Sequence, residues 1–434
     1  MITKFYNLFI NIYGFAMKVA SLWNPKAKQW KDGRKGFFEK LSKTLENLPN
    51  GNPTIWMHCA SLGEFEQGRP LLEKIKARHP QAKIILTFFS PSGYEIRKGY
   101  KGVNLVCYLP LDTASNAATF VNYINPTLVL WVKYEFWLHY LQELKRKDIP
   151  VLLISGLLQN ENAFYKLYRK RLLACFTHFF VQTEASAQKL AAIGFSENVT
   201  VSGDTRFDRV IEIAEAFEHI PAVAKFCSGH KVLVAGSTWT EDEEELTHYV
   251  RVNPDIRFII APHEVDEENI KDLQKEFPRS VLFSALQSKP FHNEAVKAFD
   301  ALAGSAQPNE VINTLIIDNI GMLSRLYKYA DITYVGGGFG ESGLHNILEA
   351  AVYGKPVFFG PVYQKHFEAI ELEDAGGAIS IENALELEAR LKELWENENL
   401  LKEKGEAAKQ YVYASAGATG YIMDYIYKNR LLTN

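Results

Sequence analysis

The sequence predicts an α/β protein with two parallel sheets, each covered by helices on both faces. Three observations predict this fold class. Short segments of apolar and β-branched residues alternate with helical patterns along most of the chain. The alternation occurs twice, and a mostly polar stretch at residues 209–230 separates the two sets. A glycine-rich turn in the second set follows a strand pattern and precedes a helical one, as in nucleotide-binding βαβ units.

The composition is that of a large globular protein. Its 434 residues predict two or three domains, and 47% hydrophobic residues suffice for well-packed cores. A net charge of −3 gives no overall attraction to nucleic acid. The four cysteines lie far apart without a Cys-x-x-Cys pair, which argues against zinc and disulfides and for a reducing compartment. Because neither Asp-x-Asp nor His-x-x-x-His occurs, we expect no metal site and no bound cofactor.

The N-terminal segment, residues 1–45, is predicted to associate with a membrane. Residues 5–23 carry apolar and aromatic side chains at helical spacing, and a lysine-rich stretch follows. Polar residues interrupt the run, so we expect a helix that lies in the membrane interface, with Trp23 at the boundary and the lysines against anionic headgroups. The alternative is a helix buried against the protein. Removal of residues 1–24 is expected to release the protein from membranes.

The first α/β set occupies residues 46–208. A strand at 55–60, a turn and an amphipathic helix place Glu64 at a strand-to-helix junction, where open α/β sheets bind their ligands. We expect further strands at 83–87, 103–108, 128–132, 151–155, 179–182 and 199–201, and helices at 113–124, 137–147 and 184–192.

A basic amphipathic helix is predicted at residues 163–176. Lys166, Arg169, Lys170 and Arg171 alternate there with aromatic and leucine side chains. The pattern suits a phosphorylated lipid or a headgroup surface. A solvated charged face over a core stripe is the alternative.

The second α/β set occupies residues 231–400, after the linker at 209–230. The acidic run Glu241–Glu245 is interpreted as the exposed first turn of a helix. After residue 377 the pattern is helical, at 384–396 and 403–427, and residues 401–434 are expected to pack back across the hinge. We expect strands at 232–235, 257–261, 281–283, 314–317, 332–335 and 357–359, and a helix at 322–329.

The glycine-rich turn joins the strand at 332–335 to a helix that we expect to begin at Leu344. Gly338, Gly340 and Gly343 allow backbone N–H groups to approach an anion closely. The N-terminus of the helix adds partial positive charge at the same place. A phosphate group is therefore the expected guest.

The helix after this turn favours a single nucleotide over a dinucleotide. The glycine spacing matches the dinucleotide fingerprint, but the following strand lacks the acidic residue that binds the ribose of NAD. Glu349, one turn after Asn346, is placed to reach the ribose of a mononucleotide instead. We therefore favour a nucleotide-sugar donor. The alternative is a tight turn with a packing glutamate.

Four stretches together identify a family resemblance. They are HCASLGEFEQGRPLL at 58–72, GDTRFDR at 203–209, GSTWTEDEEEL at 236–246 and GGGFGESGLHNILEAAVYGKPVFFGP at 336–361. The chain resembles the 3-deoxy-D-manno-octulosonic acid (Kdo) transferases of lipopolysaccharide assembly, over nearly its whole length. The resemblance implies a GT-B fold, with two Rossmann-like domains facing across a cleft. It also implies a metal-independent, inverting transfer from CMP-Kdo, bound by the second domain, to a lipid A precursor, bound by the first, at the cytoplasmic face of the inner membrane.

The resemblance also assigns site residues. Glu64 matches the catalytic glutamate of the family. In two places the sequence departs from the family pattern. Glu135 is the one glutamate kept from a Glu-x-Glu-x-Trp-Pro element, and Pro262-His263-Glu264 replaces the usual Pro-Arg-His. The residues that match donor-nucleotide contacts are Arg206, Ser237, Thr238, Asn346 and Glu349.

The side chains themselves suggest roles with structural alternatives. Glu64 is the expected general base for the attacking hydroxyl, and a helix cap is its alternative role. Arg206 is expected to stabilise the leaving phosphate, or else to pair with a neighbouring aspartate. His345 and His366 are candidates for phosphate or sugar-carboxylate contacts, or for structural histidines.

Three rival functions remain open from the sequence. The first is a GT-B glycosyltransferase that uses a UDP-sugar. The second is a catalytically silent, nucleotide-binding membrane protein. The third is a dehydrogenase, which is disfavoured because the acidic residue that a dinucleotide site needs after Phe359 is missing.

Overall fold

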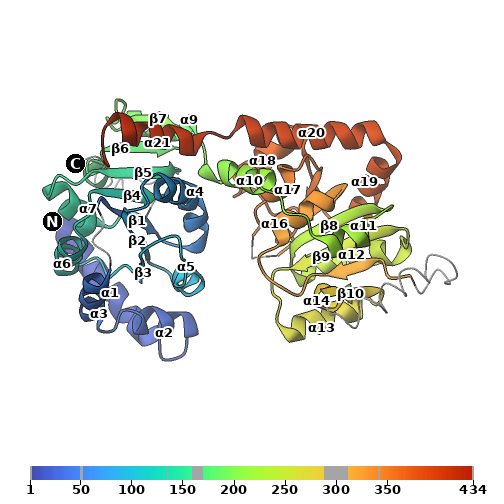
Figure 1. Ribbon diagram of the computed structural model, residues 1–434, viewed down its shortest axis with the longest axis horizontal. Helices are drawn as coiled ribbons and strands as arrows, with labels where there is room; N and C mark the ends of the chain where they lie inside the picture. Colours follow the sequence, from blue (N-terminus) through green and yellow to red (C-terminus); the bar gives the residue numbers. More distant parts are fainter. Residues whose placement is uncertain are drawn as a thin grey trace. The chain divides into compact units, whose positions relative to one another are not determined.

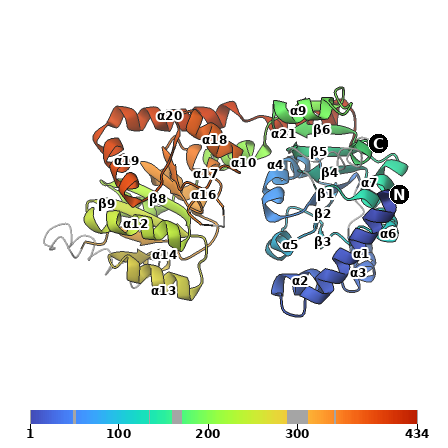
Figure 2. The same ribbon diagram turned by 180° about the vertical axis from the view of Figure 1, so that it is seen from behind.

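The computed structural model describes residues 2–48, 52–133, 135–158, 170–287, 311–340 and 343–432. The chain forms two compact units, Met1–Asp208 with Ala416–Asn434, and Arg209–Ser415. Within the described residues, each unit contains a seven-stranded sheet with helices on both faces (Figures 1 and 2). Every strand pair is parallel, so the predicted fold class is confirmed.

The sheet of the first unit has the order β3-β2-β1-β4-β5-β6-β7. Its first strand, β1, lies between β2 and β4, so the strand order reverses direction beside β1. Ligands of open parallel sheets bind outside the carboxyl ends of the strands at such a point. The strands are β1 (Thr54–Cys59), β2 (Lys83–Phe88), β3 (Leu105–Tyr108), β4 (Leu128–Val132), β5 (Val151–Gly156), β6 (His178–Val181) and β7 (Val199–Val201).

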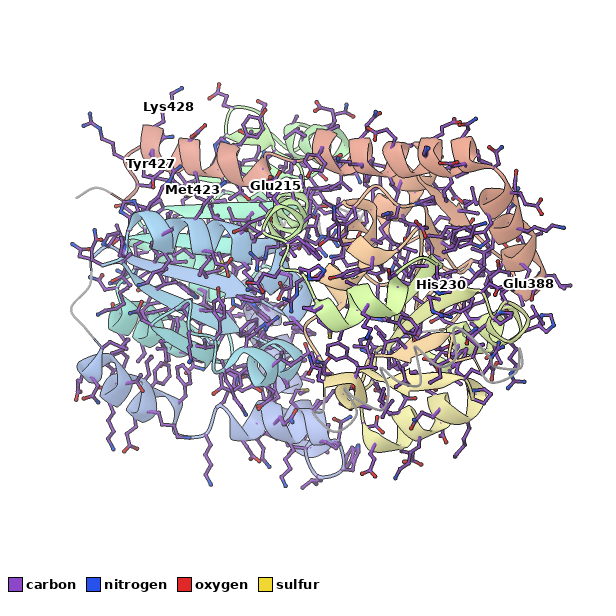
Figure 3. The ribbon with its side chains drawn as sticks, turned by 45° about the vertical axis from the view of Figure 1, so that its right-hand side comes forward. Glu215, His230, Glu388, Met423, Tyr427 and Lys428 are labelled. Atoms are coloured by element: carbon purple, nitrogen blue, oxygen red, sulfur yellow. The ribbon has the colours of Figure 1, made fainter. Side chains whose placement is uncertain are left out.

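Alternate residues of these strands pack under different helices. Trp56 and Trp131 belong to the core beneath α6 (Ala114–Ile124) and α7 (Leu138–Arg146). Their neighbours Met57 and Leu130 belong to the core beneath α4 (Leu62–Arg78) and α21 (Ala418–Lys428). Met423 of α21, labelled in Figure 3, is part of this second core. Because both faces are buried, the strands are continuous apolar runs. Two further helices of this unit are α5 (Pro91–Arg97) and α9 (Glu184–Ala191).

Three helices precede the first strand: α1 (Ile2–Ala20), α2 (Pro25–Asp32) and α3 (Phe37–Asn47). No helix among the described residues is long and apolar enough to cross a membrane.

Arg34 belongs to the basic stretch that follows residue 23, but it packs against the protein instead of joining the exposed lysines. Its guanidinium lies over the rings of Trp30, at 4.2 Å, and Tyr108, at 4.6 Å, and donates to the carbonyls of Trp30, Phe89 and Leu109. This arginine therefore fixes the end of α2 to the edge of the sheet.

The sheet of the second unit has the order β10-β11-β9-β8-β12-β13-β14. Its first strand, β8, lies between β9 and β12, so this sheet also reverses its strand order beside its first strand. The strands are β8 (Lys231–Thr238), β9 (Ile256–Pro262), β10 (Ser280–Leu282), β11 (Thr314–Ile316), β12 (Ile332–Val335), β13 (Val357–Phe359) and β14 (Ala378–Ser380).

Helices cover this sheet on both faces as well (Figure 2). One core of this unit joins β8, β9 and β12 to α12, α13 and α19. The helices are α10 (Thr205–Glu215), α11 (Pro221–Cys227), α12 (Thr240–Val252), α13 (Glu267–Glu276), α14 (Phe283–Gln287), α16 (Leu323–Leu326) with the 3-10 turn η1 (Tyr327–Tyr329), α17 (Leu348–Ala351), α18 (Phe367–Asp374), α19 (Ala384–Glu396) and α20 (Glu398–Ala414).

Two predictions of the secondary structure near the C-terminus were wrong. The chain is not purely helical after residue 377, because β14 adds an edge strand at once, pairing Ala378 with Val357. A three-residue strand is too short to give a periodic signal. The helix predicted at 403–427 is two helices, and Gly417, with a φ of 114°, separates them.

Candidate active site

Glu64 lies at the carboxyl end of β1, in the first turn of α4. Its side chain is 6% exposed, and one carboxylate oxygen accepts the backbone N–H of Ala60. The predicted position at a strand-to-helix junction is thus confirmed, and the junction coincides with the reversal of strand order. The helix-capping contact is present too, because the carboxylate bonds to the backbone beside its own helix.

Burial gives Glu64 the basicity of a general base near neutral pH. The pKa of Glu64 is raised from 4.5 to about 8, chiefly because the carboxylate loses water. The negative charge of Glu135 contributes to this rise, whereas the backbone N–H of Ala60 and the positive charge of Lys133 oppose it. A base is most effective when its pKa lies near the working pH. The structure therefore decides the balance of effects that the sequence left open.

Lys133 and Glu135 follow β4, the neighbour of β1 across the reversal of strand order. Lys133 has a φ of 68°, an unfavourable conformation for a side chain with a Cβ atom. Burial raises the pKa of Glu135 to about 7, and its Oε2 has no hydrogen-bond partner among the described residues. A buried carboxylate oxygen without a protein partner is suited to a substrate hydroxyl.

The GDTRFDR stretch is bonded to α4, the helix that carries Glu64. Asp204 is buried and accepts from the Gln67 amide of α4 at 2.8 Å. The Arg206 guanidinium donates to the same carboxylate at 2.9 Å. The structural alternative for Arg206, pairing with Asp204, is therefore present. Its contact with the donor stays a prediction.

Three aromatic rings meet at the carboxyl ends of β9, β8 and β12 in the second unit. Trp239 stacks on His263, and His263 stacks on His345, each pair with ring centroids 4.5 Å apart. The Trp239 indole also donates to His345 Nε2 at 3.1 Å. The pKa of His345 is lowered to about 4, chiefly by burial, and the charges of His263 and His366 contribute to this shift. The His345 imidazole is therefore neutral near pH 7. The sequence had pointed to the histidines but not to Trp239.

The acidic run after Trp239 forms the first turn of α12, as predicted, but two of its carboxylates are buried rather than exposed. Asp242 and Glu243 are 1% and 3% exposed. Asp242 accepts from the N–H groups of Trp239, at 2.9 Å, and Gly337, at 2.8 Å, and from the hydroxyl of Tyr334, at 2.7 Å. This carboxylate therefore ties the end of β8 to the glycine-rich turn. A charge pattern in sequence does not distinguish such a buried anchor from a solvated turn.

The first glycines of the turn are required by close packing. A Cβ atom on Gly338 would lie 2.6 Å from the backbone nitrogen of Gly360. One on Gly337, whose φ is 91°, would lie 2.2 Å from the carbonyl oxygen of Gly343. A Cβ atom on Gly340 would approach the Glu241 carboxylate no closer than 3.4 Å, and one on Gly343 would approach His366 Nε2 no closer than 3.5 Å. These two glycines are therefore less tightly packed than Gly337 and Gly338.

The turn presents backbone donors rather than the N-terminus of a long helix. The helix predicted from Leu344 is a single turn, α17, that begins at Leu348. The chain first folds back, and the His345 N–H donates to the Gly336 carbonyl at 3.1 Å. In the described part of the chain, the N–H groups of Gly338 and Gly340 donate to no protein group. Such N–H groups are suited to phosphate oxygens.

Ser237 and Thr238 end strand β8 beside this turn. Ser237 has a φ of 52°, and the pairing of β8 with β9 shifts register there. Thr238 is 1% exposed, and its hydroxyl donates to Glu243 at 2.7 Å. The strained Ser237 is thus the more accessible of the two predicted donor contacts.

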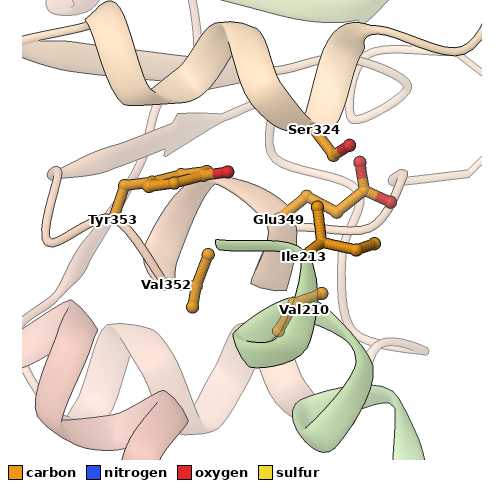
Figure 4. A pocket seen from close by; sticks show the side chains of 6 residues that line it. All are labelled: Val210, Ile213, Ser324, Glu349, Val352 and Tyr353. Carbon is orange, nitrogen blue, oxygen red and sulfur yellow. The ribbon is translucent and has the colours of Figure 1, made fainter. Parts of the chain in front are cut away.

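Asn346 and Glu349 are brought together, since the Asn346 amide donates to the Glu349 carboxylate at 3.1 Å. Glu349 lines a shallow depression that is open to solvent. Figure 4 shows its carboxylate directed toward Ser324. The depression is lined by Val210, Ile213, Ser324, Glu349, Val352 and Tyr353.

Two of the four predicted basic residues can be located. Lys166 and Arg169 lie outside the described residues. Lys170 and Arg171 are exposed next to the buried Leu172 and Leu173. That arrangement is amphipathic and agrees with both predicted roles, a lipid contact and a solvated charged face.

No group of three or more His, Cys, Asp or Glu side chains in the described ranges is arranged to hold a metal ion. The four cysteines are free and buried.

Comparisons with known proteins agree with this architecture. Residues 32–209 match the family described as 3-deoxy-D-manno-octulosonic-acid transferase (kdotransferase). A 3-deoxy-D-manno-octulosonic acid transferase of Aquifex aeolicus is 28% identical, over 83% of this chain and 90% of its own length. A bifunctional glycosyltransferase/methyltransferase of Fusobacterium nucleatum is 27% identical over 81% of this chain, which spans only 54% of that relative.

The fold is also found among solved structures. A glycosyltransferase from Rickettsia africae superposes with a TM-score of 0.54 at 15% sequence identity, covering 89% of this chain and 100% of that protein. At this level of identity the likeness concerns the fold alone.

Proposed function

We propose that this chain, which belongs to the Kdo transferase family of glycosyltransferases, transfers Kdo from CMP-Kdo to a lipid A precursor. The transfer is inverting and independent of a metal ion. The similarity to Kdo transferases supports Kdo transfer in lipopolysaccharide synthesis. We propose in addition that the acceptor is a lipid A precursor and that the anomeric configuration is inverted.

The observation that carries the proposal is the buried carboxylate of Glu64. It lies after the carboxyl end of β1, the strand that pairs with β4, and its pKa is raised to about 8. The charge of a second buried carboxylate, Glu135, contributes to this rise. A catalytically silent nucleotide-binding protein has no need of such a group. Perturbed carboxylates at the ligand-binding edge of a sheet are typical of catalytic sites.

The residues support the following chemistry. The ionised Glu64 takes the proton of an acceptor hydroxyl while the oxygen of that hydroxyl attacks the anomeric carbon of the donor sugar. The bond from that carbon to the phosphate oxygen breaks on the opposite face, and CMP leaves with the bonding electrons, which inverts the configuration. Backbone N–H groups such as those of Gly338 and Gly340 stabilise the leaving phosphate. Preorganised donors of this kind contribute about 3 kcal/mol each.

One experiment tests the activity directly. The purified protein is incubated with CMP-Kdo and a lipid A precursor, and the lipid is weighed by mass spectrometry. The proposal expects a mass increase of one or more Kdo residues and release of CMP. A lipid of unchanged mass, or equal transfer from a UDP-sugar, would contradict it.

Glu349→Ala is expected to weaken CMP binding about tenfold. A carboxylate bonded to ribose hydroxyls contributes roughly 1.5–3 kcal/mol, in the range for hydrogen bonds to charged groups. Isothermal titration calorimetry with CMP measures the change. The control is Glu388→Ala in the same unit, a glutamate labelled in Figure 3 whose carboxylate bonds to His248. Equal affinities of the two variants would exclude the ribose contact.

We further propose that the protein binds the cytoplasmic face of the inner membrane through α1. One face of this helix exposes large apolar side chains, among them Phe9 at 60% and Phe15 at 68%. The lysines on and after the helix are exposed too, including Lys18, Lys26 and Lys28. An apolar stripe flanked by positive charge is complementary to an anionic lipid surface.

Phe9→Ser with Phe15→Ser is expected to lower partition onto anionic phospholipid vesicles at least tenfold. Burial of one large apolar side chain contributes about 1.5–3 kcal/mol, of which an interfacial helix gains part. Vesicle sedimentation measures the change. Leu385→Ser is the matched control, since Leu385 is 80% exposed on α19 in the second unit. Unchanged partition of the double variant would refute this role of α1.

A further inference from the structure

The inner face of α1 is bonded to the start of α7. The Tyr6 hydroxyl donates to Asp112 and accepts the backbone N–H of Leu138 at 3.3 Å. The Asn7 side-chain oxygen lies 2.6 Å from His139 Nε2. These contacts lie opposite the exposed phenylalanines of the helix, so α1 has one face bonded to the protein and another face open.

Asp112 connects Tyr6 to the helix end. It is 1% exposed, and its two carboxylate oxygens accept the N–H groups of His139 and Tyr140, each at 3.0 Å. These N–H groups belong to the first turn of α7 and have no partner within the helix. A carboxylate at this position fixes where the helix begins.

The segment that carries Glu135 ends where α7 begins. Only Phe136 and Trp137 separate Glu135 from Leu138. The other end of the segment is held by the Trp131 indole, which donates to the Glu135 carbonyl. The place of the Glu135 carboxylate, and hence its effect on Glu64, therefore depends on the fixed beginning of α7.

We infer that Tyr6 is a positioning residue for Glu135, so that α1 takes part in catalysis as well as in surface binding. This inference rests on the proposed Kdo transfer. The Tyr6 hydroxyl and Asp112 hold the first turn of α7, and this turn holds Glu135 beside Glu64. Small displacements of catalytic groups lower rates strongly, about 100-fold for 1 Å.

Tyr6→Phe is expected to lower kcat about tenfold and to leave KM for CMP-Kdo unchanged. The variant keeps the ring and loses only the hydroxyl. The acid limb of the pH–rate profile is expected to move to lower pH, because a displaced Glu135 raises the pKa of Glu64 less. A purely structural hydroxyl would not move this limb. Rates are measured on a detergent-dispersed acceptor, so that vesicle binding plays no part.

Tyr123→Phe is the matched control. Tyr123 lies on α6, which shares a core with α7, and its ring stacks on Phe38. Among the described residues its hydroxyl makes no hydrogen bond. Equal kcat and equal acid limbs for the two variants and the unaltered protein would overturn the inference.

Amide hydrogen exchange provides a readout that does not depend on activity. Tyr6→Phe is expected to speed exchange in residues 135–140 and to leave β4 unchanged, whereas Tyr123→Phe changes neither. If the unaltered protein transfers no Kdo, the proposed function fails, and exchange still tests the positioning. Unchanged exchange in residues 135–140 would overturn the inference by itself.

Discussion

Glu64→Gln is expected to lower kcat by at least about two orders of magnitude, with the affinity for CMP-Kdo kept within about twofold. The amide keeps the shape of the side chain and an oxygen that accepts the Ala60 N–H. It does not accept a proton from the acceptor hydroxyl at neutral pH. Single-turnover kinetics separate this loss from product release, and calorimetry with CMP measures the binding.

The melting temperature of the same variant tests whether misfolding causes the loss of activity. The pKa of Glu64 is higher in the folded protein than its ordinary value of 4.5, so the carboxyl stabilises the fold below about pH 4.5 and loses this effect as pH rises through about 8. The neutral amide has no such dependence. Glu64→Gln is therefore expected to melt at a higher temperature than the unaltered protein at pH 9.

Glu66→Gln is the matched control for this prediction. Glu66 lies two residues further along α4, and its carboxylate pairs with Arg97 at 2.8 Å. Its activity is expected to stay close to that of the unaltered protein. Retention of more than a tenth of kcat by Glu64→Gln would remove Glu64 from the role of base.

Charge changes at Lys133 and Glu135 are expected to move the acid limb of kcat/KM in opposite directions. The base must be ionised, so the rate of the unaltered protein rises with pH through about 8. Glu135→Gln removes a negative charge that raises the pKa of Glu64, and the limb moves to lower pH. Lys133→Met removes a positive charge that lowers it, and the limb moves to higher pH.

Each shift is expected to be about one pH unit or more, the usual effect of a charge next to a carboxylate. Below the limb, one unit changes the rate tenfold. The pH dependence of kcat/KM measures both shifts, with Lys133→Arg as the control that keeps the charge. Shifts in the same direction for Glu135→Gln and Lys133→Met would exclude an electrostatic effect on Glu64.

Much of the fold was predictable from short stretches of sequence. The strand at 128–132 and the junction at Glu64 lie where the pattern places them, because a buried parallel strand is a continuous apolar run bounded by turn residues. The helix predicted from Leu344 was wrong, because contacts outside the local pattern decide its start. Its apolar spacing is helical, but the His345 N–H bonds back to the Gly336 carbonyl, and the helix begins only at Leu348.

The sequence by itself determined the two parallel sheets, the resemblance to the Kdo transferases, and the positions of Glu64 and the glycine-rich turn, since each depends on residues close together in the chain. Only the tertiary structure decided the charge environment of these residues. The burial of Asp242, the stack of Trp239 on His263 and the influence of Glu135 on Glu64 all join residues from separate strand ends. The loss of water and the approach of charges that set a pKa arise from packing between such segments, and no local pattern of residues records them.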